Sequence, residues 1–106
     1  MMIARMLAVV LAIVVSVPSV VRGQGAGIEW DTLNNEVGNL YRAGKYDRAV
    51  VLAKKALEVA EENVGPDHPD VGTSLENLAK LYRATKRIRE AEKLEEQAAR
   101  IRAIKR

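Results

Sequence analysis

The chain has 106 residues, which allows at most one small domain, and it contains no cysteine. Disulfide bridges and thiolate metal sites are therefore excluded. Residues 24–79 carry five basic and ten acidic side chains, whereas residues 80–106 carry ten basic and four acidic ones. The balance after residue 23 is about +1, so the composition does not indicate a nucleic-acid-binding protein.

Residues 1–23 have the three-part layout of a secretory signal peptide. A short start that contains Arg5 is followed by an apolar run from Met6 to Val17, and then by Pro18 and small residues up to Gly23. Pro18 interrupts the run before it reaches the roughly 18–20 apolar residues that a membrane span needs. We therefore expect cleavage after Gly23 and export to the periplasm or the medium.

Two alternatives to this layout stay open. Cleavage could follow residue 19 instead of residue 23. The segment could also be retained, with residues 6–21 as a membrane anchor. Membrane association is expected only in that second case.

After a linker at 24–30, residues 31–106 contain an internal repeat. The tetrapeptide "LYRA" occurs at 40–43 and at 81–84, an offset of 41. The pair Ala49 and Ala56 recurs as Ala91 and Ala98, an offset of 42. We place the extra residue in the turn inside the second unit, because turns change length more easily than packed faces do. The units span about 31–65 and 68–102.

Each unit is predicted to form two helices, which gives an all-α fold without strands. In the first unit, Gly44 ends one helix and the next begins near Tyr46. Apolar residues at helical spacing define the buried faces of the four helices. They are Leu33, Val37, Leu40 and Tyr41; Ala49, Ala53, Ala56, Leu57 and Ala60; Val71, Leu75, Leu78, Ala79 and Tyr82; and Ile88, Ala91, Leu94, Ala98 and Ile101.

The stretch "GPDHPDV" at 65–71 separates the two units. Gly65 is placed to end a helix in a left-handed conformation, and Pro66 cannot continue one. Pro69 suits the first position of the next helix, where its missing N–H is not needed. Asp70 then lies in the first turn, where the helix dipole favours negative charge. We interpret the stretch as a linker between helices.

No catalytic or metal-binding constellation is apparent, so we predict that the protein is not an enzyme and needs no cofactor. His68 is the only histidine, and a metal ion would need several further ligands. Ser74, the only serine after the signal segment, falls inside a packed helix. The carboxylates of Glu92, Glu95 and Glu96 lie on a highly charged helix and are interpreted as a solvated face.

The stretches "LNNEVGNLYRAGKYDRA…AKKALEVAEENVGPDHPDV" at 33–71 and "TSLENLAKLYRATKRIREAEKLEEQAARI" at 73–101 resemble tetratricopeptide repeats of the 42-residue, kinesin-light-chain type. The resemblance covers nearly all of the chain after the signal segment. It implies four antiparallel helices in a short α-solenoid. Two departures stand out: Lys86 replaces the usual turn glycine, and Ala53 and Glu95 replace a large aromatic residue midway along the second helix.

The resemblance also implies a non-catalytic protein–protein interaction module. In this family the first helices of successive repeats line a concave groove that holds a peptide or a partner helix. Carried over position by position, the groove candidates are Asn35, Asn39, Arg42, Glu76, Lys80 and Arg83. Because cations predominate among them, an acidic peptide or a free C-terminal carboxylate is the expected ligand.

A different class of function is also compatible with the sequence. Two repeats bury little surface, and stacked arrays usually need about three for stability. A self-assembling or membrane-anchored structural scaffold is therefore the alternative to an exported adaptor, and a homo-oligomer is one form that it would take.

Overall fold

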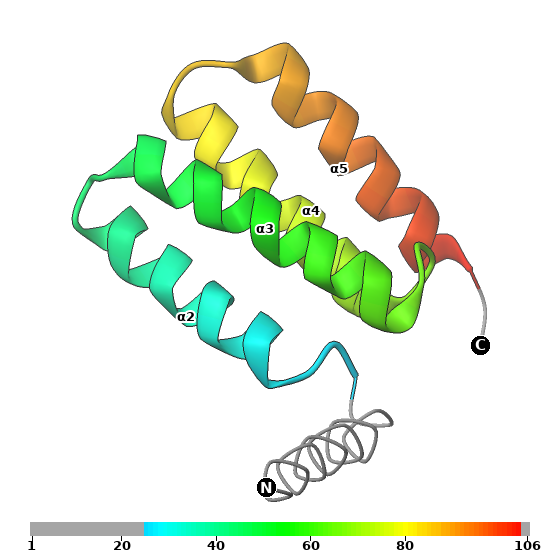
Figure 1. The fold of residues 1–106 in the computed structure, drawn as a ribbon. Coiled ribbons are helices and arrows are strands. Elements are labelled where there is room, and N and C mark those ends of the chain that lie inside the picture. Colours follow the sequence, from blue (N-terminus) through cyan, green and yellow to red (C-terminus); the bar gives the residue numbers. More distant parts are fainter. Residues whose placement is uncertain (1–24, 105–106) are drawn as a thin grey trace, which may run out of the picture.

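A computed structural model describes residues 25–104, which form four α-helices joined by short connections (Figure 1). The helices are α2 (Ile28–Arg42), α3 (Tyr46–Val64), α4 (Pro69–Ala84) and α5 (Ile88–Ala103). Each helix packs against its neighbours in the chain, so α2 and α3 form one antiparallel hairpin and α4 and α5 form the second. The prediction of an all-α chain of two helix–turn–helix repeats is confirmed for these residues, which contain no strand.

The N-terminal segment of residues 1–23, with its predicted cleavage site and alternative anchor, lies outside the described residues. None of the four described helices is both long and apolar enough to cross a membrane.

The turns inside the two hairpins have the same length and the same hydrogen-bonding pattern. In the first, Gly44 N–H donates to the Tyr41 carbonyl and Lys45 N–H to that of Leu40. In the second, Lys86 N–H donates to Arg83 and Arg87 N–H to Tyr82. Both are Schellman turns, in which a residue with positive φ ends the helix.

The placement of the extra residue in the second turn is therefore wrong. Three residues separate the helices in each hairpin, 43–45 and 85–87. Within the "LYRA" motifs, Ala43 lies just beyond α2, whereas Ala84 is the last residue of α4. The extra residue therefore belongs to α4, which has 16 residues where α2 has 15. The turn that follows keeps the same hydrogen bonds in both hairpins.

The "GPDHPDV" stretch connects α3 to α4 as predicted. Pro69 is the first residue of α4, and His68 caps it: Nδ1 accepts a hydrogen bond from Asp70 N–H at 3.0 Å. Gly65 has a positive φ of 87° but a ψ of 159°, so it lies outside the left-handed helical region that the sequence predicted. In this extended conformation, Gly65 directs the chain away from α3 directly after its last residue, Val64.

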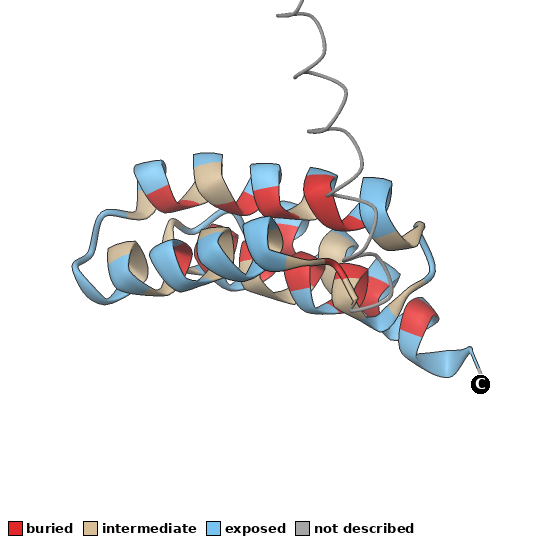
Figure 2. Cartoon of the chain, turned by 60° about the horizontal axis from the view of Figure 1, so that its bottom comes forward, coloured by how far each residue is buried: buried red, intermediate tan, exposed pale blue. Residues whose placement is uncertain are grey.

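Two apolar clusters fill the space between the helices, and Figure 2 shows the buried residues on the sides of the helices that face one another. One cluster joins all four helices near the hairpin turns and contains Val37, Ala53, Leu78 and Leu81, among others. The second lies around the α3–α4 connection and the end of α5. The predicted faces are confirmed in large part. All the alanines that were predicted to face the core on α3 and α5 are buried; they are Ala49, Ala53, Ala56, Ala60, Ala91 and Ala98.

Ile88 was expected in the core, but it is 41% exposed. It is the first residue of α5, where the chain has only just left the turn and no neighbouring helix covers it. Ser74 is buried, in line with its expected place inside a packed helix, and Leu81 and Val59 are buried although the sequence did not single them out. Leu81 lies on the side of α4 that faces α2, and the periodicity of a single helix does not show that contact.

The chain is already part of the fold before α2 begins. Ala26 is buried, its N–H donates to Asp70 Oδ2 at 2.9 Å, and its carbonyl accepts from Asn63 Nδ2 at 2.7 Å. These bonds attach the segment to the start of α4 and the end of α3. The structure thus differs from the predicted linker at 24–30 in its described part, because Ala26 is held by two hydrogen bonds and α2 starts at Ile28.

Candidate peptide-binding surface

The facing sides of α2 and α4 are joined by a row of polar contacts between the two repeats. The indole N–H of Trp30 donates to Ser74 Oγ at 2.7 Å, and Asn77 Nδ2 donates to Asn34 Oδ1 at 3.3 Å. Nearer the hairpin turns, the Lys80 ammonium lies 5.4 Å from the centre of the Tyr41 ring, a cation–π contact. The row sets the spacing between the first helices of the two repeats.

A small hollow of about 140 Å³ lies between these two helices. Its lining combines apolar, amide and cationic side chains from α2 and α4. They are Asn34, Val37, Gly38, Tyr41, Arg42, Asn77, Lys80 and Leu81. Because Gly38 has no side chain and the amides offer both donors and acceptors, a peptide can approach the two cations there.

The structure brings together two of the six residues predicted for the groove. Arg42 and Lys80 both line the hollow. Asn39 is exposed beside it, and its Oδ1 accepts a hydrogen bond from Arg42 Nη2 at 2.6 Å. Asn35 is exposed on α2 but does not line the hollow. The first repeat therefore contributes one cation, positioned by a neighbouring amide.

The other two candidates are paired with α5. The Arg83 guanidinium donates two hydrogen bonds to the carboxylate of Glu95, at 2.6 and 2.8 Å. These bonds, together with the charge of Arg83, lower the pKa of Glu95, and the same contact raises the pKa of Arg83. Glu76 forms an ion pair with Arg102. Both residues thus face a partner within the chain.

Sequence reasoning missed Asn34 and Asn77, which form the amide pair in the hollow. The 41-residue offset aligns Asn34 with Leu75, and Asn77 with Glu36. The two asparagines are therefore not equivalent positions of the repeat. They meet because α2 and α4 lie side by side, and no pattern within one repeat contains that packing.

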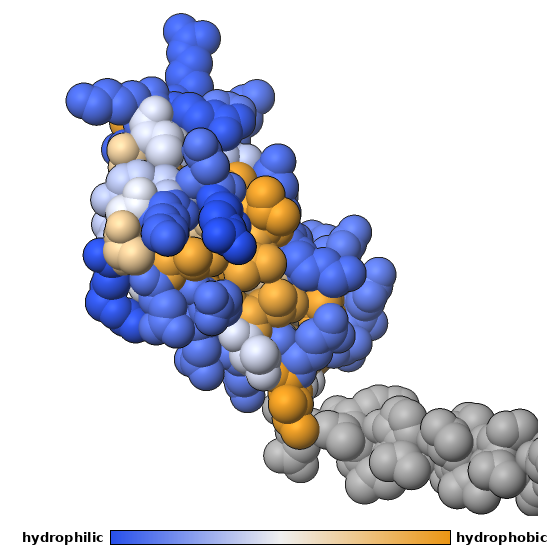
Figure 3. Space-filling model, turned by 60° about the vertical axis from the view of Figure 1, so that its left-hand side comes forward, coloured by the Kyte–Doolittle hydropathy of each residue, from blue (hydrophilic) through white to orange (hydrophobic). Residues whose placement is uncertain are grey.

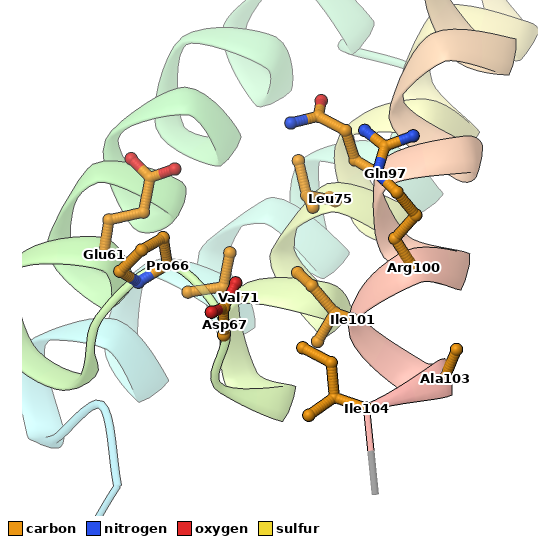
Figure 4. Close-up of a pocket in the computed structure, with 10 residues that line it drawn as sticks. All are labelled: Glu61, Pro66, Asp67, Val71, Leu75, Gln97, Arg100, Ile101, Ala103 and Ile104. Carbon is orange, nitrogen blue, oxygen red and sulfur yellow. The ribbon is translucent and has the colours of Figure 1, made fainter.

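A second, larger hollow of about 520 Å³ lies where the α3–α4 connection meets the end of α5 (Figure 4). Apolar side chains including Val71, Leu75 and Ile101 lie on its inner side, and Figure 4 shows Glu61 and Asp67 across from Arg100. None of the six predicted groove residues lines it. It was not expected from the sequence.

The surroundings of His68 and Ser74 match structural roles. His68 caps α4, and Ser74 is buried with its hydroxyl engaged by Trp30. Across residues 25–104, no three side chains of His, Cys, Asp or Glu converge as they would around a metal ion.

Comparison with known proteins agrees with this architecture. The tetratricopeptide repeat family matches residues 31–103. The protein KINESIN LIGHT CHAIN-RELATED 1 of Arabidopsis thaliana is 35% identical over 78 residues, which is 73% of this chain and 13% of that protein. Nephrocystin-3 of Homo sapiens is 45% identical over 55 residues, which is 52% of this chain and 4% of that protein.

The chain thus spans only a small part of the length of either relative. The match covers both hairpins and the connection between them. Tetratricopeptide repeats are a class of non-catalytic helical scaffolds that mediate contacts between proteins. The sequence match and the paired helices together show that this chain belongs to the tetratricopeptide repeat family.

Proposed function

We propose that the protein is an exported adaptor that binds an acidic segment, or a free C-terminal carboxylate, of a partner protein across α2 and α4. The observation that carries this proposal is the position of Arg42 and Lys80 at one hollow, with Asn34 and Asn77 beside them. The likeness to a family of protein-binding scaffolds supports it.

The chemistry of the hollow suits a carboxylate. The Arg42 guanidinium can form two parallel hydrogen bonds to one carboxylate, and the Lys80 ammonium adds a point charge. The side-chain amides can hydrogen-bond the peptide backbone on either side. Because the hollow is small and open to water, we expect a dissociation constant in the micromolar range or weaker, about −8 kcal/mol at most.

The test is titration of the full chain with a short Asp- and Glu-rich peptide, in one form with a free C-terminus and in another with an amidated C-terminus. Arg42→Ala with Lys80→Ala should abolish binding while the helical content stays unchanged. The matched control removes one arginine and one lysine elsewhere, Arg89→Ala with Lys93→Ala on the exposed side of α5. Equal loss of binding in both variants would show nonspecific charge attraction and would contradict the proposal.

Two further outcomes of the titration identify the groups involved. Loss of affinity on amidation alone would identify the terminal carboxylate as the ligand. Added salt should weaken binding, because partly exposed charges are screened over roughly 8–10 Å. Arg83→Ala should change affinity little, since Glu95 occupies that guanidinium.

Export is a separate part of the proposal and rests on the signal-peptide layout of residues 1–23. Intact mass of the protein from its own cell should show a chain that starts at Gln24. A full-length chain in the membrane fraction would instead support the anchored scaffold, and a full-length chain in the cytosol would contradict both.

A further inference from the structure

The outer face of α5 differs from the face of α3 between the repeats at several positions, and at two of them a long charged side chain replaces alanine. Ala53 and Ala60 lie seven residues apart on α3, are 1% and 0% exposed, and belong to the clusters that join α3 to α4. Their equivalents on α5, 42 residues later, are Glu95 and Arg102. Small residues at these places let α4 approach α3, and long charged residues replace them on α5.

The two charged side chains of α5 form ion pairs with α4. In one pair α5 supplies the acidic side chain, and in the other it supplies the basic one. Glu95 of α5 pairs with Arg83 of α4, and Arg102 of α5 pairs with Glu76 of α4. Glu76 and Arg83 are also seven residues apart, so the pairs form two rungs across one face. The side chains of Glu95 and Arg102 are 41% and 56% exposed, which places the rungs at the surface.

At the opposite end of the stack, no ion pair joins α2 to α3 among residues 25–104. On α4, Ser74 and Leu81 are each 1% exposed because the first repeat covers them. Their equivalents on α2, Leu33 and Leu40, are only half-buried, since no helix precedes them in the described residues. Figure 3, which brings the α2 side of Figure 1 forward, shows apolar side chains in a band between hydrophilic ones.

A second copy of the chain therefore carries a matching element. Its α2 ends in Leu-Tyr-Arg at 40–42, the same three residues that α4 carries at 81–83, where Leu81 and Tyr82 belong to the cluster shared with α3. An α2 helix could lie on α5 of another copy as α4 lies on α3, and repetition of that contact would give an open, head-to-tail chain. At the two rung positions, charged side chains of α5 stand where α3 has alanine.

We infer that the Arg83–Glu95 and Glu76–Arg102 pairs close the α4–α5 face against head-to-tail stacking of a second copy. Covering this face with α2 would take four charged groups out of water, and ion pairs repay that desolvation poorly. The stop is thus built from side chains of α4 and α5 themselves.

The test compares two double variants of the full chain by analytical ultracentrifugation. Glu95→Ala with Arg102→Ala restores the residues found on α3, and alanine favours the helix. This variant should show a weight-average mass that rises with concentration to at least twice that of the monomer. The control, Arg87→Ala with Glu90→Ala, removes another ion pair of α5 that lies at its start, and it should stay monomeric like the wild type.

Mixing identifies the two surfaces. Adding Leu33→Glu to the open-faced variant blocks its α2, so this triple variant alone should be monomeric. Mixed with wild-type protein, which has a closed α5 face and an unaltered α2, it should form a 1:1 dimer and nothing larger.

Three results would overturn the inference: a monomeric Glu95→Ala, Arg102→Ala variant with unchanged helical content, association of the control to the same extent, or wild-type protein that already stacks head to tail. Circular dichroism of each variant shows that the helices are intact. If the double variant is unfolded, the single change Glu95→Ala opens one rung and should give weaker association of the same kind.

Discussion

Lys86 occupies in the second hairpin turn the left-handed backbone position that Gly44 occupies in the first, with φ of 66° against 77°. A side chain at positive φ costs roughly 1–2 kcal/mol, and glycine avoids this strain but loses more freedom on folding. Lys86→Gly should therefore stabilise the protein by about 0.5–1 kcal/mol, measured by urea denaturation.

The reverse change at the first turn is the control for that prediction. Gly44→Lys should destabilise the protein by about 1 kcal/mol from backbone strain alone, because nothing lies within 4 Å of the position that its Cβ would take. If both substitutions shift stability in the same direction, the backbone conformation is not the cause.

Ser74→Ala should remove the acceptor of the Trp30 indole N–H in the partly buried contact between α2 and α4. A donor that is left without its partner costs about 1–3 kcal/mol. Trp30 is the only tryptophan, so its fluorescence reports on this contact during denaturation. The neighbouring Thr73→Ala, at an exposed position, should change stability by less than about 0.5 kcal/mol.

His68→Ala should cost about 1 kcal/mol, because it removes the side-chain acceptor that caps α4. His68→Asn should recover most of that loss, since asparagine is a preferred residue at this position. Thermal denaturation of the three proteins measures both effects. Loss of peptide binding by folded His68→Ala protein would instead give the imidazole a functional role.

The carboxyl of Glu95 should titrate below the ordinary glutamate pKa of about 4.3, because Arg83 donates two hydrogen bonds to its charged form. A lowered pKa means that the contribution of the pair to stability is complete above the ordinary pKa and is lost as the pH falls through the lowered one. Carboxyl chemical shifts should show the Glu95 pKa rising in Arg83→Ala, while the pKa of Glu90, lowered by Arg87, stays where it is.

Much of the fold could be predicted because repetition and helical spacing act within short stretches of chain. The positions of Gly44, Pro69 and the small residues Ala49 and Ala56 followed from local backbone geometry and periodicity. The conformation of Gly65 and the exposure of Ile88 differed because each depends on the path by which the chain leaves or enters a helix.

The candidate site could be predicted less well, because it depends on how the two repeats sit against each other. Arg42 and Lys80 were found by carrying positions over from the family, and they do line one hollow. The engagement of Arg83 and Glu76 by α5 was not foreseen. Their partners lie 12 and 26 residues further along the chain, and only the packing of α4 against α5 brings them into reach.

The two hydrogen bonds at Ala26 attach the chain directly to Asp70 at the start of α4 and to Asn63 at the end of α3. Tension applied to the chain from the N-terminal side is therefore delivered at the junction of α3 and α4, and it bypasses α2. The two hairpins would then rotate together about that junction. Under increasing load, the bonds to Asp70 and Asn63 would break before the helical hairpins separate.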